Sequence, residues 1–253
     1  MSEYRLYIDD SGHPDDQPFV VVAGFVSTAE KWAAFETAWP ATLTSLGLKT
    51  VFHMTDFMTQ KRKVKERSVI LETIRGVIAG HTLAQFAGAV EIRGYKRVNA
   101  EYALEECLGA PLALAARGMA LDLNKWKVGH LGPADTLLLF AEEGSKHRGD
   151  LAAVFERDRL PVPTAVQKGV ACVQPADILA WSMFDYLRTG KPLRRLQKLI
   201  GGQDTFGSMF REDDLRRTVA EMIPRIMLRS ELTPSATISF HTTPKRPRKR
   251  TIK

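Results

Sequence analysis

The chain has 253 residues, of which 44% are hydrophobic, enough to bury the core of one large domain. No apolar run approaches the roughly 20 residues that a membrane-spanning helix needs, and the N-terminus lacks the pattern of a secretory signal. We therefore expect a cytoplasmic protein without a membrane partner, and the net charge of +7 suggests a polyanion as its partner.

Most of the positive charge lies at the C-terminus. Six basic residues there leave residues 1–244 with a net charge of only +1; they are Lys245, Arg246, Arg248, Lys249, Arg250 and Lys253. Because this segment contains prolines and few apolar residues, we predict that residues 231–253 form a disordered basic tail after a domain of residues 1–230. Such a tail either binds phosphates in a salt-dependent way, without reading sequence, or is solvated and has no function.

Two strands are predicted at the N-terminus, over residues 4–12 and 19–26, and the short polar connection between them indicates an antiparallel pair. The first strand ends in Asp9 and Asp10. Strand interiors disfavour aspartate, and adjacent carboxylates repel, so these acids indicate a site for a cation such as Mg²⁺. The structural alternative is an Asx turn that leaves the strand.

A helical insertion follows the second strand. Ser27 or Thr28 caps a helix that we expect to kink or restart at Pro40. Residues 51–57 are predicted to be extended, and residues 66–79 form an amphipathic helix.

Two features of this insertion have both a structural and a functional interpretation. His53 lies between apolar residues, which is typical of a structural histidine. The basic cluster at residues 61–65 either contacts a phosphate backbone or is the solvated start of a helix.

Further along the chain, residues 82–92 are predicted to form a central strand, and residues 99–126 a long helical region broken near Pro111. The apolar run 136–141 predicts a buried parallel strand. It is followed directly by Glu142 and Glu143, so this strand repeats the acidic ending of the first one.

The last elements expected are a short helix at 149–157, an edge strand at 161–167 and a helix that begins near residue 174. Asp177 lies in the first turn of that helix, where a carboxylate is favoured by the free backbone amides. Residues 191–229 are predicted to form one or two further helices.

Acids therefore end the first and fourth strands and begin a late helix. In open sheets with parallel strands, such positions can converge on one crevice, so Asp9, Glu142 and Asp177 are the candidate catalytic residues. Two divalent ions bridged by carboxylates would activate a water molecule and stabilise the leaving oxygen of a phosphodiester. Carboxylate oxygens favour Mg²⁺ or Mn²⁺ over zinc.

Four stretches of the chain resemble signature motifs of the bacterial proteins catalogued as domain of unknown function 3800. They are Tyr-Ile-Asp-Asp-Ser-Gly at 7–12, Phe-His-Met-Thr-Asp-Phe at 52–57, Glu-Glu-Gly-Ser at 142–145 and Gln-Pro-Ala-Asp at 174–177. The resemblance covers about residues 3–190, and that family is similar in fold to ribonuclease H and the retroviral integrases. It implies an α/β fold with a mixed five-stranded sheet, three antiparallel strands and then two parallel ones, flanked by helices. A helical insertion between strands 2 and 3 and extra C-terminal helices complete the expected fold.

The resemblance also implies roles for the acids. Asp9 matches the first metal carboxylate of ribonuclease-H-like nucleases, and Glu142 and Asp177 match the acids of the fourth strand and the last core helix. The chain has Asp10 where glutamate is more usual, and Glu-Gly-Ser where Asp-Gly-Asp often follows the fourth-strand acid. The second difference removes a carboxylate, so either another residue completes the site or the site is degenerate; the candidates are Glu143, His147 and Asp150.

The leading hypothesis is a two-metal nuclease that uses Mg²⁺ or Mn²⁺, with nucleic acid as its partner. The expected metal ligands are Asp9, Asp10, Glu142, Glu143 and Asp177. The expected substrate-binding residues are His53, Lys146, His147, Arg148, Lys245, Arg246, Arg248, Lys249 and Arg250. The main alternative is an inactive ribonuclease-H-like module that binds nucleic acid or protein, and a third is a phosphohydrolase acting on a small nucleotide.

Overall fold

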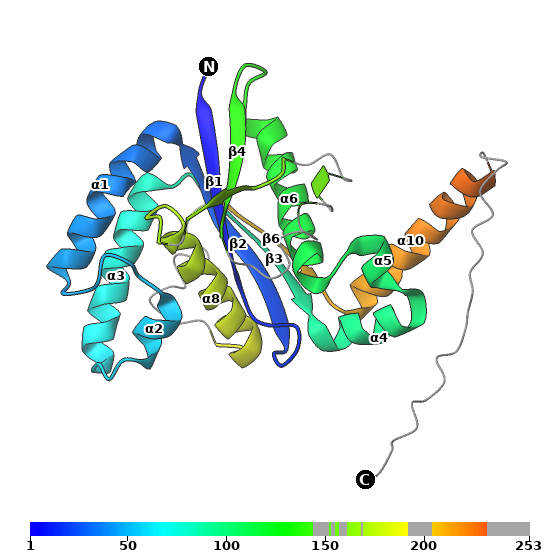
Figure 1. Cartoon of the computed structure of the whole chain (residues 1–253), viewed down its shortest axis with the longest axis horizontal. Coiled ribbons are helices and arrows are strands. Elements are labelled where there is room, and N and C mark those ends of the chain that lie inside the picture. The colour runs from blue at the N-terminus through cyan, green and yellow to red at the C-terminus, as the bar shows by residue number, and fades with distance from the viewer. Residues whose placement is uncertain (144–151, 153–154, 157–160, 168, 192–203, 232–253) are drawn as a thin grey trace, which may run out of the picture. The chain divides into compact units, whose positions relative to one another are not determined.

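The structure is a computed structural model that describes residues 1–143, 152, 155–156, 161–167, 169–191 and 204–231 (Figure 1). The chain divides into two compact units, Met1–Arg216 and Arg217–Lys253. The fold and the candidate site described below belong to the first unit. Among the described residues, no helix is both long enough and apolar enough to span a membrane.

The first unit is built on one mixed sheet with the strand order β5-β4-β1-β2-β3-β6. Its strands are β1 (Glu3–Ser11), β2 (Phe19–Thr28), β3 (Ala84–Glu91), β4 (Thr136–Glu142), β5 (Thr164–Val166) and β6 (Asp204–Phe210). Strands β1, β2 and β3 pair antiparallel, while β4 runs parallel to β1 and β5 runs parallel to β4. This is the expected arrangement of three antiparallel strands followed by two parallel ones.

The expected number of five strands is wrong, because β6 adds a sixth strand next to β3. The segment 191–229 was predicted to be helical, and β6 is a seven-residue strand within it. Its pairing with β3 depends on contacts distant in sequence: the Phe206 ring stacks on Phe86 with centroids 5.2 Å apart, and Gln85 donates a hydrogen bond to Thr205 over 2.6 Å. Tertiary contacts of this kind commonly decide whether a short segment becomes a strand.

The helical insertion between β2 and β3 is confirmed as three helices. The helices of the structure are α1 (Ala29–Ser45), α2 (Met54–Thr59), α3 (Val64–His81), α4 (Ile92–Tyr102), α5 (Leu104–Leu108), α6 (Pro111–His130), α8 (Gln174–Thr189) and α10 (Glu212–Glu231). Helix α1 continues through Pro40, so the expected restart there does not occur. The extended conformation predicted for residues 54–57 is wrong, because they begin α2. Thr28 caps α1 by accepting a hydrogen bond from the backbone N–H of Lys31.

Helices cover both faces of the sheet (Figure 1). On one face, Tyr7 packs edge-on against Trp32 of α1, and α8 packs against β1 and β2. On the other face, α6 packs against β3 so closely that a Cβ atom at Gly88 would lie 1.9 Å from the carbonyl oxygen of Ala115. The two faces therefore differ, and the candidate acids lie on the face covered by α1 and α8.

Candidate functional site

Strands β1 and β4 bring Asp9 and Glu142 together. The parallel pairing joins Ile8 to Ala141, so Asp9 and Glu142 are the next residues on the two neighbouring strands. Side chains alternate along a strand, and Tyr7 and Phe140, two residues earlier, stack on each other with ring centroids 5.0 Å apart. The carboxylates of Asp9 and Glu142 therefore project from the same face, which is the face covered by α8.

Helix α8 supplies the third acid, Asp177, from its first turn. The Oδ2 atom of Asp177 accepts a hydrogen bond of 2.6 Å from the backbone N–H of Met54, the first residue of α2. This carboxylate thus satisfies an amide at the start of a different helix, in addition to the expected stabilisation of its own helix. The contact fixes α2 next to the acids.

Gln174 holds the same region in place, and the sequence analysis did not identify it. Its buried side chain accepts hydrogen bonds from the indole N–H of Trp39 at 2.9 Å and from the backbone N–H of Phe52 at 2.7 Å. Its amide nitrogen donates to the carbonyl oxygen of Gly169 at 3.0 Å. The motifs at 52–57 and 174–177 are thus joined directly by hydrogen bonds, from Phe52 to Gln174 and from Met54 to Asp177. In the sequence, Gln174 stands out as the first residue of the motif at 174–177 and as a polar residue directly before a proline at a helix start.

Each of the three carboxylates has one oxygen fixed by a backbone amide. Asp9 Oδ1 accepts from the N–H of Asp10 at 2.9 Å, Glu142 Oε1 accepts from the N–H of Gly169 at 3.2 Å, and Asp177 is bound to Met54. Within the described part of the chain, the second oxygen of each carboxylate accepts no hydrogen bond, and no lysine or arginine forms an ion pair with it. Among the described residues, these second oxygens are therefore the ones left to bind a cation.

The acids interact electrostatically across the site. Burial raises the pKa of Asp9 to about 8, and the negative charges of Asp10, Asp177 and Glu142 contribute to this increase. Burial also raises the pKa of Asp177, while the hydrogen bond from Met54 opposes the increase. A half-buried group of like charges with no lysine or arginine partner among the described residues favours a bound cation.

Two residues of the 52–57 motif also belong to this electrostatic environment. His53, which is half-buried directly before α2, lowers the pKa of Asp177 by its charge, and the exposed Asp56 raises it. His53 was a predicted candidate, whereas Asp56, the third polar residue of the motif, was not. Both side chains lie at the side of the site formed by α2.

The two remaining predicted metal ligands, Asp10 and Glu143, do not project from the same face as Asp9 and Glu142. Asp10 follows Asp9 on β1, so strand alternation directs its side chain to the opposite face. Glu143 is exposed in the turn after β4, where its N–H donates to the carbonyl oxygen of Val166 at 2.9 Å. Asp10 therefore acts on Asp9 through its charge.

The other predicted substrate-binding residues lie outside the described residues. They are Lys146, His147, Arg148, Lys245, Arg246, Arg248, Lys249 and Arg250, and the alternative ligand Asp150 lies outside them as well.

The donor atoms of the site suit Mg²⁺ or Mn²⁺, which prefer oxygen ligands. In the described ranges, no three His, Cys, Asp or Glu side chains come together closely enough to form a ready-made metal site. Mg²⁺ commonly binds through one or two carboxylates and completes its shell with water and substrate phosphate oxygens. One or two of the carboxylates of Asp9, Glu142 and Asp177 would suffice for this second mode of binding.

Comparison with known proteins finds no family model that matches the sequence and no curated protein that is similar to it. Similar solved structures include Bst-RNase HIII in complex with Mn²⁺, with 16% sequence identity and a TM-score of 0.42. A mutant of the same protein has 17% identity and a TM-score of 0.41. Both alignments cover 79% of this chain and 56% of the other, so the chain spans little more than half the length of these structures.

Proposed function

We propose that this protein is a divalent-metal-dependent phosphodiesterase that hydrolyses nucleic acid, and that it belongs to the family catalogued as domain of unknown function 3800. The observation that carries the proposal is the orientation of Asp9, Glu142 and Asp177, each with one oxygen held by a backbone amide and the other without a hydrogen bond from any described residue. The four sequence motifs that resemble the family include all three acids.

In this proposal, Asp9, Glu142 and Asp177 hold Mg²⁺ or Mn²⁺, two ions in the complete site. When bound, the ions activate a water molecule and stabilise the charge that develops on the phosphodiester oxygens. The protein's own contribution is orientation: the amides of Asp10, Gly169 and Met54 fix the three carboxylates before the substrate arrives. With a pKa of about 8, Asp9 retains a proton near neutral pH until a cation takes its place.

The alternative is a ribonuclease-H-like module without catalytic activity. It is supported by the same three hydrogen bonds, because each acid also has a structural role at a strand end or helix start. Under this alternative, the acids would stabilise the fold, and their replacement would change stability and not turnover.

Cleavage assays with matched variants distinguish the two proposals. Labelled single- and double-stranded DNA and RNA oligonucleotides are incubated with Mn²⁺ and either the wild type, Asp9→Asn or Asp185→Asn. Asp185 lies two turns further along α8 and pairs with Arg188 on the surface, so its replacement removes one carboxylate elsewhere on the unit.

We expect Asp9→Asn to lower the cleavage rate at least about 100-fold, since metal ligation contributes several kcal/mol to transition-state stabilisation. The Asp185→Asn control should cleave at the wild-type rate. Cleavage by Asp9→Asn at the wild-type rate would contradict the proposed site. A wild type that binds these oligonucleotides and cleaves none of them in Mn²⁺ or Mg²⁺ would favour the inactive module.

A further inference from the structure

A strongly basic segment runs from the turn after α2 into the first turn of α3. Of the seven residues 61–67, five are basic and one is acidic. The basic residues are Lys61, Arg62, Lys63, Lys65 and Arg67, and the acid is Glu66. We call this stretch the basic segment; its residues have two different structural roles.

The two arginines fix the conformation of the basic segment. The guanidinium carbon of Arg62 lies 6.0 Å from the ring centroid of Phe57, and its Nε donates to the side chain of Gln60 at 2.9 Å. Arg62 also pairs with Glu66 one turn into α3, while Arg67 donates to the carbonyl oxygen of Gln60 at 3.0 Å. The turn between the two helices is thus fixed by contacts to Phe57 and Gln60 before it and to Glu66 after it.

The three lysines have no such role. Lys61, Lys63 and Lys65 are all exposed, and none of them forms an ion pair within the residues that the structure describes. Glu66 is already paired with Arg62, so the lysine charges are not compensated by the only acid of the segment. Three uncompensated positive charges on a fixed turn form a surface suited to a polyanion.

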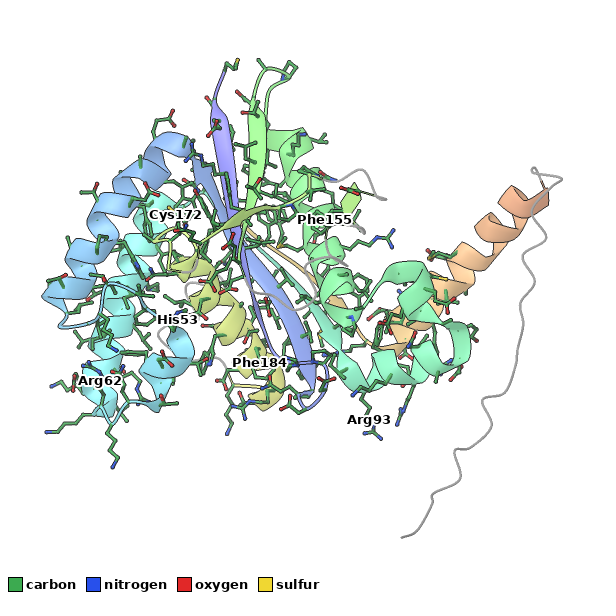
Figure 2. All side chains as sticks on the ribbon, viewed as in Figure 1. His53, Arg62, Arg93, Phe155, Cys172 and Phe184 are labelled. Atoms are coloured by element: carbon green, nitrogen blue, oxygen red, sulfur yellow. The ribbon has the colours of Figure 1, made fainter. Side chains whose placement is uncertain are left out.

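Helix α2 links this surface to the candidate site. The helix begins at Met54, which Asp177 binds, and its buried Phe57 is part of the core that also contains α8. Helix α2 has six residues and is therefore about 9 Å long. Figure 2 shows His53 and Arg62 both close to α2. One short helix therefore joins the basic segment to the residue that Asp177 binds.

We propose that Lys61, Lys63 and Lys65 bind backbone phosphates of the nucleic acid strand that the candidate site cleaves, away from the scissile bond. This inference rests on the proposed function and specifies its substrate as a polymer, since a mononucleotide has no further phosphodiesters to reach the lysines. Lysine ammonium groups act as point charges, so the contact positions the strand without reading its sequence.

A salt titration of binding tests this surface separately from catalysis. Both variants are made in the full-length chain with Asp9→Asn, and binding of labelled oligonucleotides is measured in EDTA by fluorescence anisotropy. The test variant is Lys63→Gln/Lys65→Gln. The control is Lys31→Gln/Lys127→Gln, which removes the same charge from exposed positions near the other end of β1.

We expect the test variant to bind about 5- to 20-fold more weakly at low salt, and the slope of log Kd against log salt to fall by about 1.4 to 1.8, the loss of two phosphate contacts. The control should match the parent. Equal binding by the two double variants would overturn the proposal, as would binding to anionic lipid vesicles but not to oligonucleotides. A lysine-dependent salt slope in a protein that cleaves nothing would support the surface while refuting the nuclease.

Discussion

The carboxylate of Asp177 accepts a hydrogen bond of 2.6 Å from the backbone N–H of Met54, across 123 residues of sequence. The contact joins α8, which packs on the sheet, to the insertion between β2 and β3. One oxygen of Asp177 thus holds α2, while the charge of the carboxylate acts on the pKa of Asp9. The insertion is thus part of the candidate site.

These two roles can be separated by substitution. Asp177→Asn keeps an oxygen that can accept the N–H of Met54, whereas Asp177→Ala leaves that amide without its partner. We expect the free energy of unfolding, measured by urea denaturation without metal, to fall by about 1–3 kcal/mol in Asp177→Ala and by much less in Asp177→Asn. Both variants should lose metal-dependent cleavage. If the two variants had equal free energies of unfolding, the hydrogen bond to Met54 would not contribute to stability.

Gln174 should be the most sensitive buried polar residue near the site. Replacement by leucine leaves the N–H groups of Trp39 and Phe52 unpaired in the core, which should cost about 2–5 kcal/mol of unfolding free energy. Gln85 provides a matched control, since it is equally buried but makes one described hydrogen bond and leaves its carbonyl oxygen unsatisfied. Gln85→Leu should cost about 1 kcal/mol or less. Denaturation curves of both variants test this order, and a larger loss for Gln85→Leu would contradict it.

The sheet was predictable because its signals are local. Alternation, β-branched runs and short polar connections located β1, β2 and β4 and gave the antiparallel hairpin. The missed strand β6 carries no comparable signal, since Phe206 and Thr205 become strand residues by packing on Phe86 and Gln85 of β3. Such contacts do not appear in the spacing of residues along the chain.

The acids of the site were predictable for a similar reason. Asp9 and Glu142 follow apolar strands, where a charge is conspicuous. The contacts that orient them were not predictable: Gly169 donates to Glu142 from a loop, and Gln174 binds the backbone at Phe52. These interactions use backbone groups, so no residue type marks them in the sequence.

Stability without metal should depend on pH through Asp9. Its pKa rises from an ordinary 3.8 to about 8 on folding, so the folded state holds a proton that the unfolded state loses between these values. The stabilising contribution is therefore complete below about pH 4 and is lost as pH rises to about 8. Between these pH values, the free energy of unfolding of the wild type should fall by about 2 kcal/mol relative to that of Asp9→Asn, which does not titrate. This figure is smaller than the pKa shift alone would give, because Asp9 is partly exposed to solvent. Mn²⁺ should restore much of this loss at pH 8.

Thermal melts of both proteins from pH 4 to pH 9 measure this difference. A constant gap between the wild type and Asp9→Asn across the range would show that Asp9 has no raised pKa. Asp15→Asn is a suitable control because Asp15 is exposed in the connection after β1. Its melting curve should follow that of the wild type at every pH.

The close contact between α6 and the sheet makes Gly88 irreplaceable by alanine. A Cβ atom there would lie 1.9 Å from the carbonyl oxygen of Ala115 and 3.0 Å from the amide of Met119, both backbone atoms that cannot move without shifting the helix. We expect Gly88→Ala to lower the unfolding free energy by about 3 kcal/mol or more, as overpacking does. Gly76→Ala in α3 is the control: no atom lies within 4 Å of its added Cβ, so it should stabilise the protein by about 0.5–1 kcal/mol. Urea denaturation measures both effects, and tolerance of alanine at Gly88 would refute the close packing of α6 on β3.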